Sequence, residues 1–324
     1  MISGKKILIV SGLVSAITLS LIMITSRPIW TSELGVIDHT QGRHPARPVY
    51  RFPDKVTFCG VRVPLENQDV FEMLDREFHI LVWDEALVFL LLKRANRYFP
   101  ALEAELTRRN LPQDLRYIPV AESGLKEYAF SPAGAAGIWQ FMPQTGREHN
   151  LTKDQQYDER LNFFKATRAG LDFLAKLYDR FQDWPLAIAA YNCGEGRVEK
   201  EISDQGTNDY FKLDLPLETE RYLFRIIAAK IILSSPETYG YVLASKDLYQ
   251  PKPIEQVTFH LARKTHIRDI AAACGTYYKV IKELNPELLG RQLPEGDHTL
   301  YIPKTAVKDF QRNLDNLPAT LSEK

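Results

Sequence analysis

The chain has 324 residues, of which 45% are hydrophobic and 25% are charged, so it can bury a normal core in one large domain or in two to three small ones. Its 41 lysine and arginine residues balance 41 aspartate and glutamate residues, and no charged block stands out. This balance excludes nucleic-acid binding through a general basic surface, and we expect no nucleic-acid partner.

The first 30 residues have the pattern of an export signal. Lys5 and Lys6 precede eighteen uncharged, mostly apolar residues, 7–24. That length exceeds the usual apolar core of a signal peptide and just reaches a membrane span. We favour an uncleaved signal anchor over a removed signal peptide. Both alternatives place the body outside the cytoplasm, and the anchor would hold a periplasmic protein at the inner membrane.

Helical periodicity dominates the middle of the chain. Residues 31–65 lack it and indicate a tether, with a short strand in 56–64. From residue 66 onward, apolar side chains recur at three- and four-residue steps. Further helical blocks cover 157–182 and 219–235. Because no series of alternating strands interrupts this region, the predicted fold class is mainly α.

A small separate module follows the linker marked by Pro251 and Pro253. Residues 254–304 predict the order strand, helix, helix, strand, and residues 305–324 indicate a loose helix or tail. Fifty residues are too few to hold a catalytic cleft as well as a core. The catalytic chemistry is therefore expected upstream.

Cysteine and histidine residues indicate no metal site. The three cysteines, Cys59, Cys193 and Cys274, are far apart and match no ligand spacing. The histidines are equally scattered. We predict buried, unligated thiols and neither a metal nor another cofactor.

Glu122 is the first candidate for catalysis. It stands before Ser123 and Gly124, and glycine is common just past the end of a helix. An acid in apolar surroundings has a raised pKa and can hold a proton near neutral pH, which protonation of a glycosidic oxygen requires. The competing interpretation is a solvated glutamate at a helix end.

A turn of small residues at 134–137 leads from this acid to an aromatic segment. Such residues permit close backbone approach. Trp139, Phe141 and Met142 suit either a wall against sugar rings or ordinary core packing. Gln140 is harder to explain as a core residue.

The segment "AESGLKEYAFSPAGAAGIWQFMPQTG" resembles the catalytic region of lytic transglycosylases, the peptidoglycan-cleaving relatives of goose-type lysozyme. Two later motifs, "AYNCG" and "ETERY", follow in the family's order. The resemblance covers about residues 105–240, and the layout is most similar to the membrane-bound type D group. The matched positions are Glu122, Ser123, Ser131, Gly134, Ala135, Gly137, Ile138, Gln140, Met142, Pro143, Ala190, Tyr191, Asn192, Gly194, Glu218, Thr219 and Tyr222.

The resemblance implies a lysozyme-like catalytic domain at 105–245, with residues 66–104 packed on it as a helical extension. It implies cleavage of the bond between N-acetylmuramic acid and N-acetylglucosamine without water. Glu122 would be the single catalytic acid, since Glu127 and Glu148 lie off the pattern. The implied substrate-binding residues are Ser131, Gln140, Met142, Tyr191, Asn192 and Tyr222.

Residues 254–304 resemble LysM, a module that binds glycan chains. Arg263, Lys264 and Thr265 replace the usual Gly-Asp-Thr after the first strand, which affects the expected affinity more than the fold. The implied partner is peptidoglycan, while protein partners are not indicated. Two alternatives stay open: a lysozyme-type hydrolase that uses water, and a tether that holds glycan without cleaving it.

Overall fold

The structure, a computed structural model, describes residues 48–314. The apolar segment 7–24 lies outside these residues, so the predicted anchor has no structural description. Within the described part, no helix has the length and apolar character needed to cross a membrane. The predicted mainly α fold class is confirmed.

Eight α-helices and several short 3-10 helices form the larger part of the described chain. The α-helices are α1 Gln68–Val82, α2 Glu85–Arg108, α3 Ile118–Ser123, α4 Pro143–Glu148, α5 Phe163–Phe181, α6 Trp184–Cys193, α7 Glu195–Gln205 and α8 Leu217–Ser234. The 3-10 helices are η1 Gln113–Tyr117, η2 Glu159–Leu161, η3 Tyr210–Lys212, η4 Pro236–Tyr239 and η5 Ser245–Asp247.

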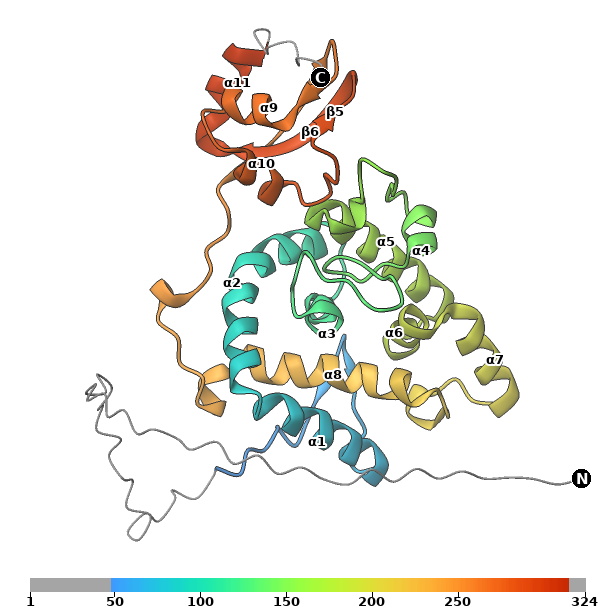
Figure 1. Ribbon diagram of the computed structural model, residues 1–324. Coiled ribbons are helices and arrows are strands. Elements are labelled where there is room, and N and C mark those ends of the chain that lie inside the picture. The colour runs from blue at the N-terminus through green and yellow to red at the C-terminus, as the bar shows by residue number, and fades with distance from the viewer. Residues whose placement is uncertain (1–47, 315–324) are drawn as a thin grey trace, which may run out of the picture. The chain divides into compact units, whose positions relative to one another are not determined.

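Side-chain caps and apolar faces explain where these helices lie. Asn67 accepts the Asp69 N–H at the start of α1, and Asp84 accepts the Leu87 N–H in the first turn of α2. Ten of the 18 residues of α8 are buried, and most of these are apolar. α1 runs alongside α8, and the short α3 lies between α2 and α6 (Figure 1). The short α3 is therefore held on several sides by longer helices.

The strand expected in 56–64 is a small hairpin. β1 Thr57–Phe58 pairs antiparallel with β2 Val61–Arg62. Phe58 and Val63 are buried in the same core as the helices, and Lys230 of α8 donates to the Thr57 carbonyl at 2.7 Å. Residues 56–63, which the sequence placed with the tether, are therefore packed against the helical domain.

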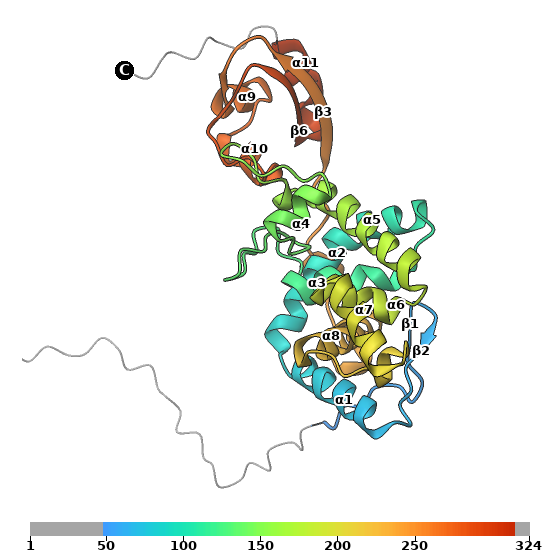
Figure 2. The same ribbon diagram turned by 90° about the vertical axis from the view of Figure 1, so that its right-hand side faces the viewer.

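The C-terminal module has the predicted strand-helix-helix-strand order, with two short strands added. Its elements are β3 Ile254–Leu261, β4 Thr265–His266, α9 Ile267–Ala273, α10 Tyr278–Leu284, β5 Gln292–Leu293, β6 Gly296–Pro303, η6 Lys304–Ala306 and α11 Val307–Asn313. β3 pairs antiparallel with β6 from end to end, and the helices α9 and α10 lie against this pair (Figure 2). Asn285, fully buried, exchanges hydrogen bonds with the backbone of Tyr301. The module has its own apolar core.

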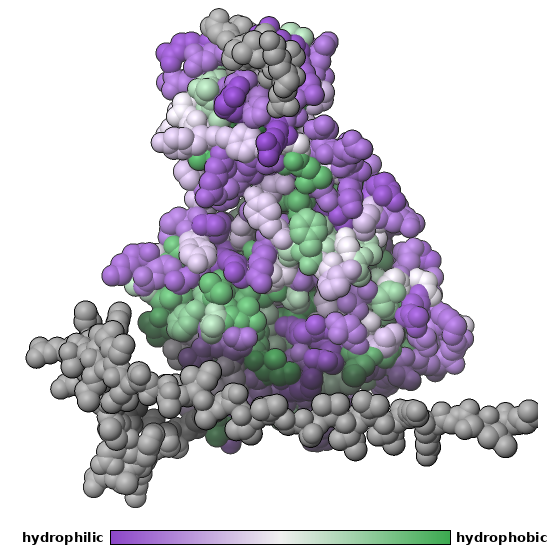
Figure 3. Space-filling view, viewed as in Figure 1, coloured by the Kyte–Doolittle hydropathy of each residue, from purple (hydrophilic) through white to green (hydrophobic). Residues whose placement is uncertain are grey.

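Hydrophilic residues cover much of the face shown in Figure 3, but apolar residues gather where the start of α2 meets the C-terminal part of α8. The described residues that expose large apolar side chains include Trp83, Leu90 and Val242. These residues lie in or beside those two helices, so this apolar surface belongs to the helical domain.

Candidate active site

Glu122 projects from the last turn of α3. The helix ends at Ser123, and Gly124 follows it with left-handed torsions (φ 59°, ψ 35°) while its N–H donates to the Val120 carbonyl. Arg94 of α2 donates to the Gly124 carbonyl at 3.0 Å. The predicted helix end is confirmed, and the acid is fixed to a short, well-held helix.

The Glu122 carboxyl is arranged to hold a proton near neutral pH. Burial raises its pKa to about 7, and the nearby charge of Glu218 raises it as well. A hydrogen bond from the Tyr222 hydroxyl and the positive charge of Arg225 act in the opposite direction. Desolvation is the largest of these effects, so a substantial fraction of the acid is protonated at neutral pH.

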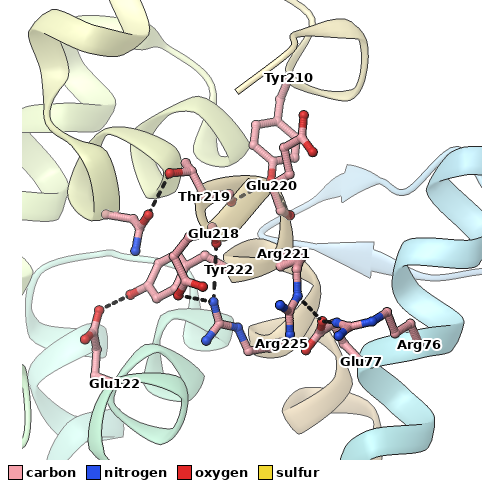
Figure 4. Close-up of polar contacts among 11 residues, drawn as sticks. Arg76, Glu77, Glu122, Tyr210, Glu218, Thr219, Glu220, Arg221, Tyr222 and Arg225 are labelled. Atoms are coloured by element: carbon pink, nitrogen blue, oxygen red, sulfur yellow. Dashed lines mark hydrogen bonds and ion pairs between the residues drawn. The ribbon is translucent and has the colours of Figure 1, made fainter. Parts of the chain in front are cut away.

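Figure 4 shows how α8 brings several polar groups to this acid. Tyr222 donates to Glu122, and one helical turn further on Arg225 forms an ion pair with Glu218. Thr219 donates to the Asn192 side-chain oxygen at 2.8 Å, which ties the start of α8 to the end of α6. The "AYN" and "ETERY" motifs therefore meet in space.

The opposite side of α8 is anchored to α1. Arg221 donates to the carboxylate of Glu77 at 2.7 Å, and Arg76 pairs with the same group. Glu77 is 3% exposed, so its charge requires these partners. Since Arg221 directly precedes Tyr222, this network fixes the position from which Tyr222 reaches the acid.

The turn between Ser131 and Met142 is held by hydrogen bonds to its own backbone. The Ser131 hydroxyl accepts the Ala135 N–H at 3.0 Å. Gln140 has a positive φ of 50°, and its amide nitrogen donates to the carbonyls of Ala129 and Gly137 at 3.2 and 2.7 Å. Both amide protons of Gln140 are thus engaged, and the amide oxygen is what it can offer to a ligand.

Ser123 joins this turn to α3. Its hydroxyl lies 2.9 Å from the Ile138 carbonyl, to which it donates, and it accepts the Lys126 N–H at 3.2 Å. The residue next to the acid therefore positions the loop.

Two aromatic side chains of this segment, which could either face sugar rings or pack in the core, pack in the core. Trp139 is fully buried, its indole N–H donates to the Thr167 hydroxyl at 3.0 Å, and its ring lies against Gly170. Phe141 is 2% exposed. Both side chains are core residues, so the interpretation as a wall against sugar rings is wrong for them. Met142, 41% exposed, is the residue of this segment that faces solvent.

Tyr191 and Asn192 lie at the end of α6. The Tyr191 hydroxyl donates to the Trp139 carbonyl at 2.9 Å, and burial together with the charge of Glu122 raises its pKa well above the usual range. Glu122, Tyr191 and Tyr222 are thus close enough to influence one another's ionisation. Asn192 is connected to α8, which carries Tyr222, by the hydrogen bond that it accepts from Thr219.

Sequence reasoning assigned no role to Arg225 or Arg160. Arg225 follows Tyr222 by three positions on a helix, which was the available signal for its place beside the acid. Arg160 is buried and holds the backbone of the active-site turn. By contrast, Glu127 lies 3.8 Å from Lys252, and Glu148 accepts from Gln144 at 3.0 Å. Neither contributes to the pKa shift of Glu122.

Residues 48–314 contain no group of three or more histidine, cysteine, aspartate or glutamate side chains that could hold a metal ion. All three cysteines are free. The groups gathered at this site are the Glu122 carboxyl and the tyrosine, amide and guanidinium groups around it.

Two family models match the chain. Residues 99–213 match the transglycosylase SLT domain, and residues 256–319 match the LysM-like domain of lytic transglycosylase MltD. The SLT match contains Glu122 and the "AYN" motif, but it ends before Tyr222.

Curated proteins are also similar to the chain. The chain is 32% identical over 227 residues to the membrane-bound lytic murein transglycosylase D of Escherichia coli K12, covering 68% of this chain and 49% of that protein. It is 39% identical over 112 residues to a putative tributyltin chloride resistance protein of Alteromonas sp. M-1, covering 34% of this chain and 54% of that protein. The chain therefore spans about half the length of these relatives.

Among solved structures, the chain is similar to the lytic transglycosylase Slt of Pseudomonas aeruginosa. That match has a TM-score of 0.34 and 24% identity, and it covers 46% of this chain and 26% of the other.

Proposed function

Because residues 99–213 belong to the transglycosylase SLT family and residues 256–319 to the LysM-like domains of lytic transglycosylase MltD, we propose that this protein is a peptidoglycan lytic transglycosylase. The proposal rests above all on the partly buried Glu122 carboxyl, whose pKa is raised to about 7 and which accepts a hydrogen bond from Tyr222. A group that must first give a proton and then take one back needs a pKa near the working pH.

Glu122 acts in both halves of the proposed reaction. It first gives its proton to the oxygen that bridges N-acetylmuramic acid and N-acetylglucosamine, and the bond from that oxygen to C1 of the muramic acid breaks. Its carboxylate then takes the proton of the C6 hydroxyl of the same muramic acid, and the C6 oxygen bonds to C1. The product ends in a 1,6-anhydro sugar, no water is consumed, and the acid is regenerated.

The other polar groups have supporting roles. Tyr222 stabilises the carboxylate that forms after the first step, since a hydrogen bond to the charged form favours that form. Gln140 offers its amide oxygen and Asn192 its amide nitrogen to sugar substituents. Tyr191, Ser131 and Met142 complete the substrate-binding set, with Met142 providing an exposed apolar contact.

The proposed organisation follows the expected boundaries, apart from the packed hairpin. Residues 66–104 are a helical extension of a catalytic domain at 105–245, and residues 254–304 bind glycan strands. Residues 1–30 are an anchor or signal that places the enzyme in the periplasm. N-terminal sequencing of membrane and soluble fractions tests this placement. A mature soluble protein starting near Ser26 would reject the anchor and keep the compartment.

A water-using hydrolase is the competing function. Most glycosidases need a second carboxylate. In the described residues, Glu218 is the acid whose charge acts on Glu122, and it is paired with Arg225. Mass spectrometry of the fragments released from purified peptidoglycan decides between the two. Products lighter by one water and without a reducing end support the lytic reaction, and products with a reducing muramic acid support hydrolysis. Binding without any release would leave only the tether.

A further inference from the structure

A buried polar contact joins the LysM-like module to the loop that precedes α5. Asn162 donates from its side-chain nitrogen to the Glu287 carboxyl at 2.7 Å, and both residues are at most 3% exposed. The Asp158 N–H donates to the Glu287 carbonyl at 2.8 Å, and the Leu289 N–H donates to the Gln156 carbonyl at 2.7 Å. These bonds pair the two segments through their backbones as well as their side chains.

Aromatic side chains extend the same contact. Tyr157 shares a hydrogen bond of 3.0 Å with His298 of β6. Phe164 of α5 stacks on Tyr301 of β6, with ring centroids 4.6 Å apart and planes 28° apart. The module therefore contacts the catalytic domain through hydrogen bonds and aromatic packing, and this interface includes the buried Glu287.

The loop that receives Glu287 also supports the active-site turn. Arg160, 1% exposed, makes a two-pronged ion pair with Asp158 at 2.8 and 2.7 Å. Its remaining nitrogen donates to the carbonyls of Gly134 and Phe141, both at 2.8 Å. At Gly137 a Cβ atom would lie only 1.9 Å from the Arg160 carbonyl oxygen. The turn and the loop are thus in direct contact, with no room between them.

We propose that Glu287 is a positioning residue of the catalytic domain, although it belongs to the LysM-like module. Its carboxyl accepts from Asn162 and its backbone carbonyl accepts from Asp158, so both hold the loop 158–162, and Arg160 in that loop passes the constraint to the turn that carries Gln140. The module then supports the active-site turn as well as binding glycan. This role goes beyond the proposed function, in which the module only binds glycan. The proposal rests on that function only where turnover is measured.

The chemistry of Glu287 suggests a conservative replacement. Burial raises the pKa of its carboxyl to about 7, and its second oxygen has no hydrogen-bond partner. A glutamine at this position keeps the oxygen that accepts from Asn162 and carries no charge. Alanine removes the acceptor and leaves the Asn162 donor buried without a partner.

The test compares full-length Glu287→Ala, Glu287→Gln and the exposed control Glu255→Ala. Hydrogen exchange is followed at the Ala136, Gly137 and Gln140 amides, which donate to the carbonyls of Phe141, Ala129 and Gly137. Turnover is measured on a soluble fragment of four sugars. In the alanine variant we expect exchange at these amides to be faster, and kcat lower, each by on the order of tenfold, with KM for the fragment little changed. The glutamine and control variants should resemble the wild type.

A second pair of variants keeps the test decisive if Glu287→Ala fails to fold. Asn162→Asp retains the oxygen that caps α5 at the Lys165 N–H but loses the donor to Glu287. Adding Glu287→Gln restores a donor–acceptor pair in reverse and should rescue both readouts. Wild-type exchange and turnover in Glu287→Ala or in Asn162→Asp, or no rescue in the double variant, would overturn the proposal. An inactive wild-type protein would reject the proposed function, while the hydrogen-exchange measurements would still test the positioning role of Glu287.

Discussion

The Tyr222 hydroxyl donates its hydrogen bond to the Glu122 carboxyl from a position 100 residues further along the chain. Burial raises the pKa of Tyr222 well above its usual range, and the charge of Glu122 raises it further, so the phenol stays a donor throughout the working pH range. The acid on α3 is thus held by a helix whose own position depends on the Arg221–Glu77 pair.

Glu122→Gln should abolish the lytic reaction while glycan binding survives. Glutamine keeps the size of the side chain but has no proton to give and take back. General acid–base groups contribute on the order of 10²–10⁴ in rate, and we expect the upper end because one residue performs both steps. Release of fragments from purified peptidoglycan is the measurement, with the exposed Glu148→Gln as control. Full activity in Glu122→Gln would remove this residue from the chemistry.

Tyr222→Phe should shift the falling limb of the pH–rate profile to higher pH. The hydroxyl favours the charged form of Glu122, so its loss raises the pKa of the acid above about 7 and keeps it protonated further into alkali. The rate at low pH should also fall, since the carboxylate formed in the first step loses a partner. Tyr241→Phe, which removes a hydroxyl bonded to the Val82 carbonyl, is the control. A profile that does not move would show that this hydrogen bond does not set the acid's pKa.

Charge changes at Arg225 and Glu218 should act in opposite directions. Arg225→Gln removes a positive charge that lowers the pKa of Glu122, so its profile should move to higher pH. Glu218→Gln removes a negative charge that raises this pKa, so its profile should move to lower pH. Both residues are partly exposed, and the shifts should shrink in high salt. Shifts of the same sign would contradict the electrostatic account.

Gly170→Ala should destabilise the catalytic domain. A Cβ atom there would lie 2.6 Å from the Trp139 ring, which is fully buried, and such overpacking costs about 1–3 kcal/mol of unfolding free energy. Gly196→Ala in α7 meets no atom within 4 Å and should instead stabilise the helix by up to about 1 kcal/mol. Thermal or denaturant unfolding of both variants checks this contrast. Equal stability of the two would mean that the ring moves aside freely.

The amino-acid sequence alone predicts the fold class, the helix end before Gly124 and the order of elements in the C-terminal module, because these depend on local periodicity and on residues with special torsions. It also marked Glu122 through motifs whose members stand in a recognisable order. Local patterns already indicate such features before any distant part of the chain is placed.

The side of the turn that each aromatic residue faces follows only from the folded structure. Trp139 is a core residue because its side chain packs against α5, where it contacts Thr167 and Gly170. The helical periodicity that began at 157 becomes a helix only at Phe163, since Asn162 caps it there and the preceding residues pair with the LysM-like module. Such outcomes depend on contacts across long separations, as between Asn162 and Glu287, 125 residues apart. No local pattern encodes them, because each partner alone is compatible with an exposed polar residue.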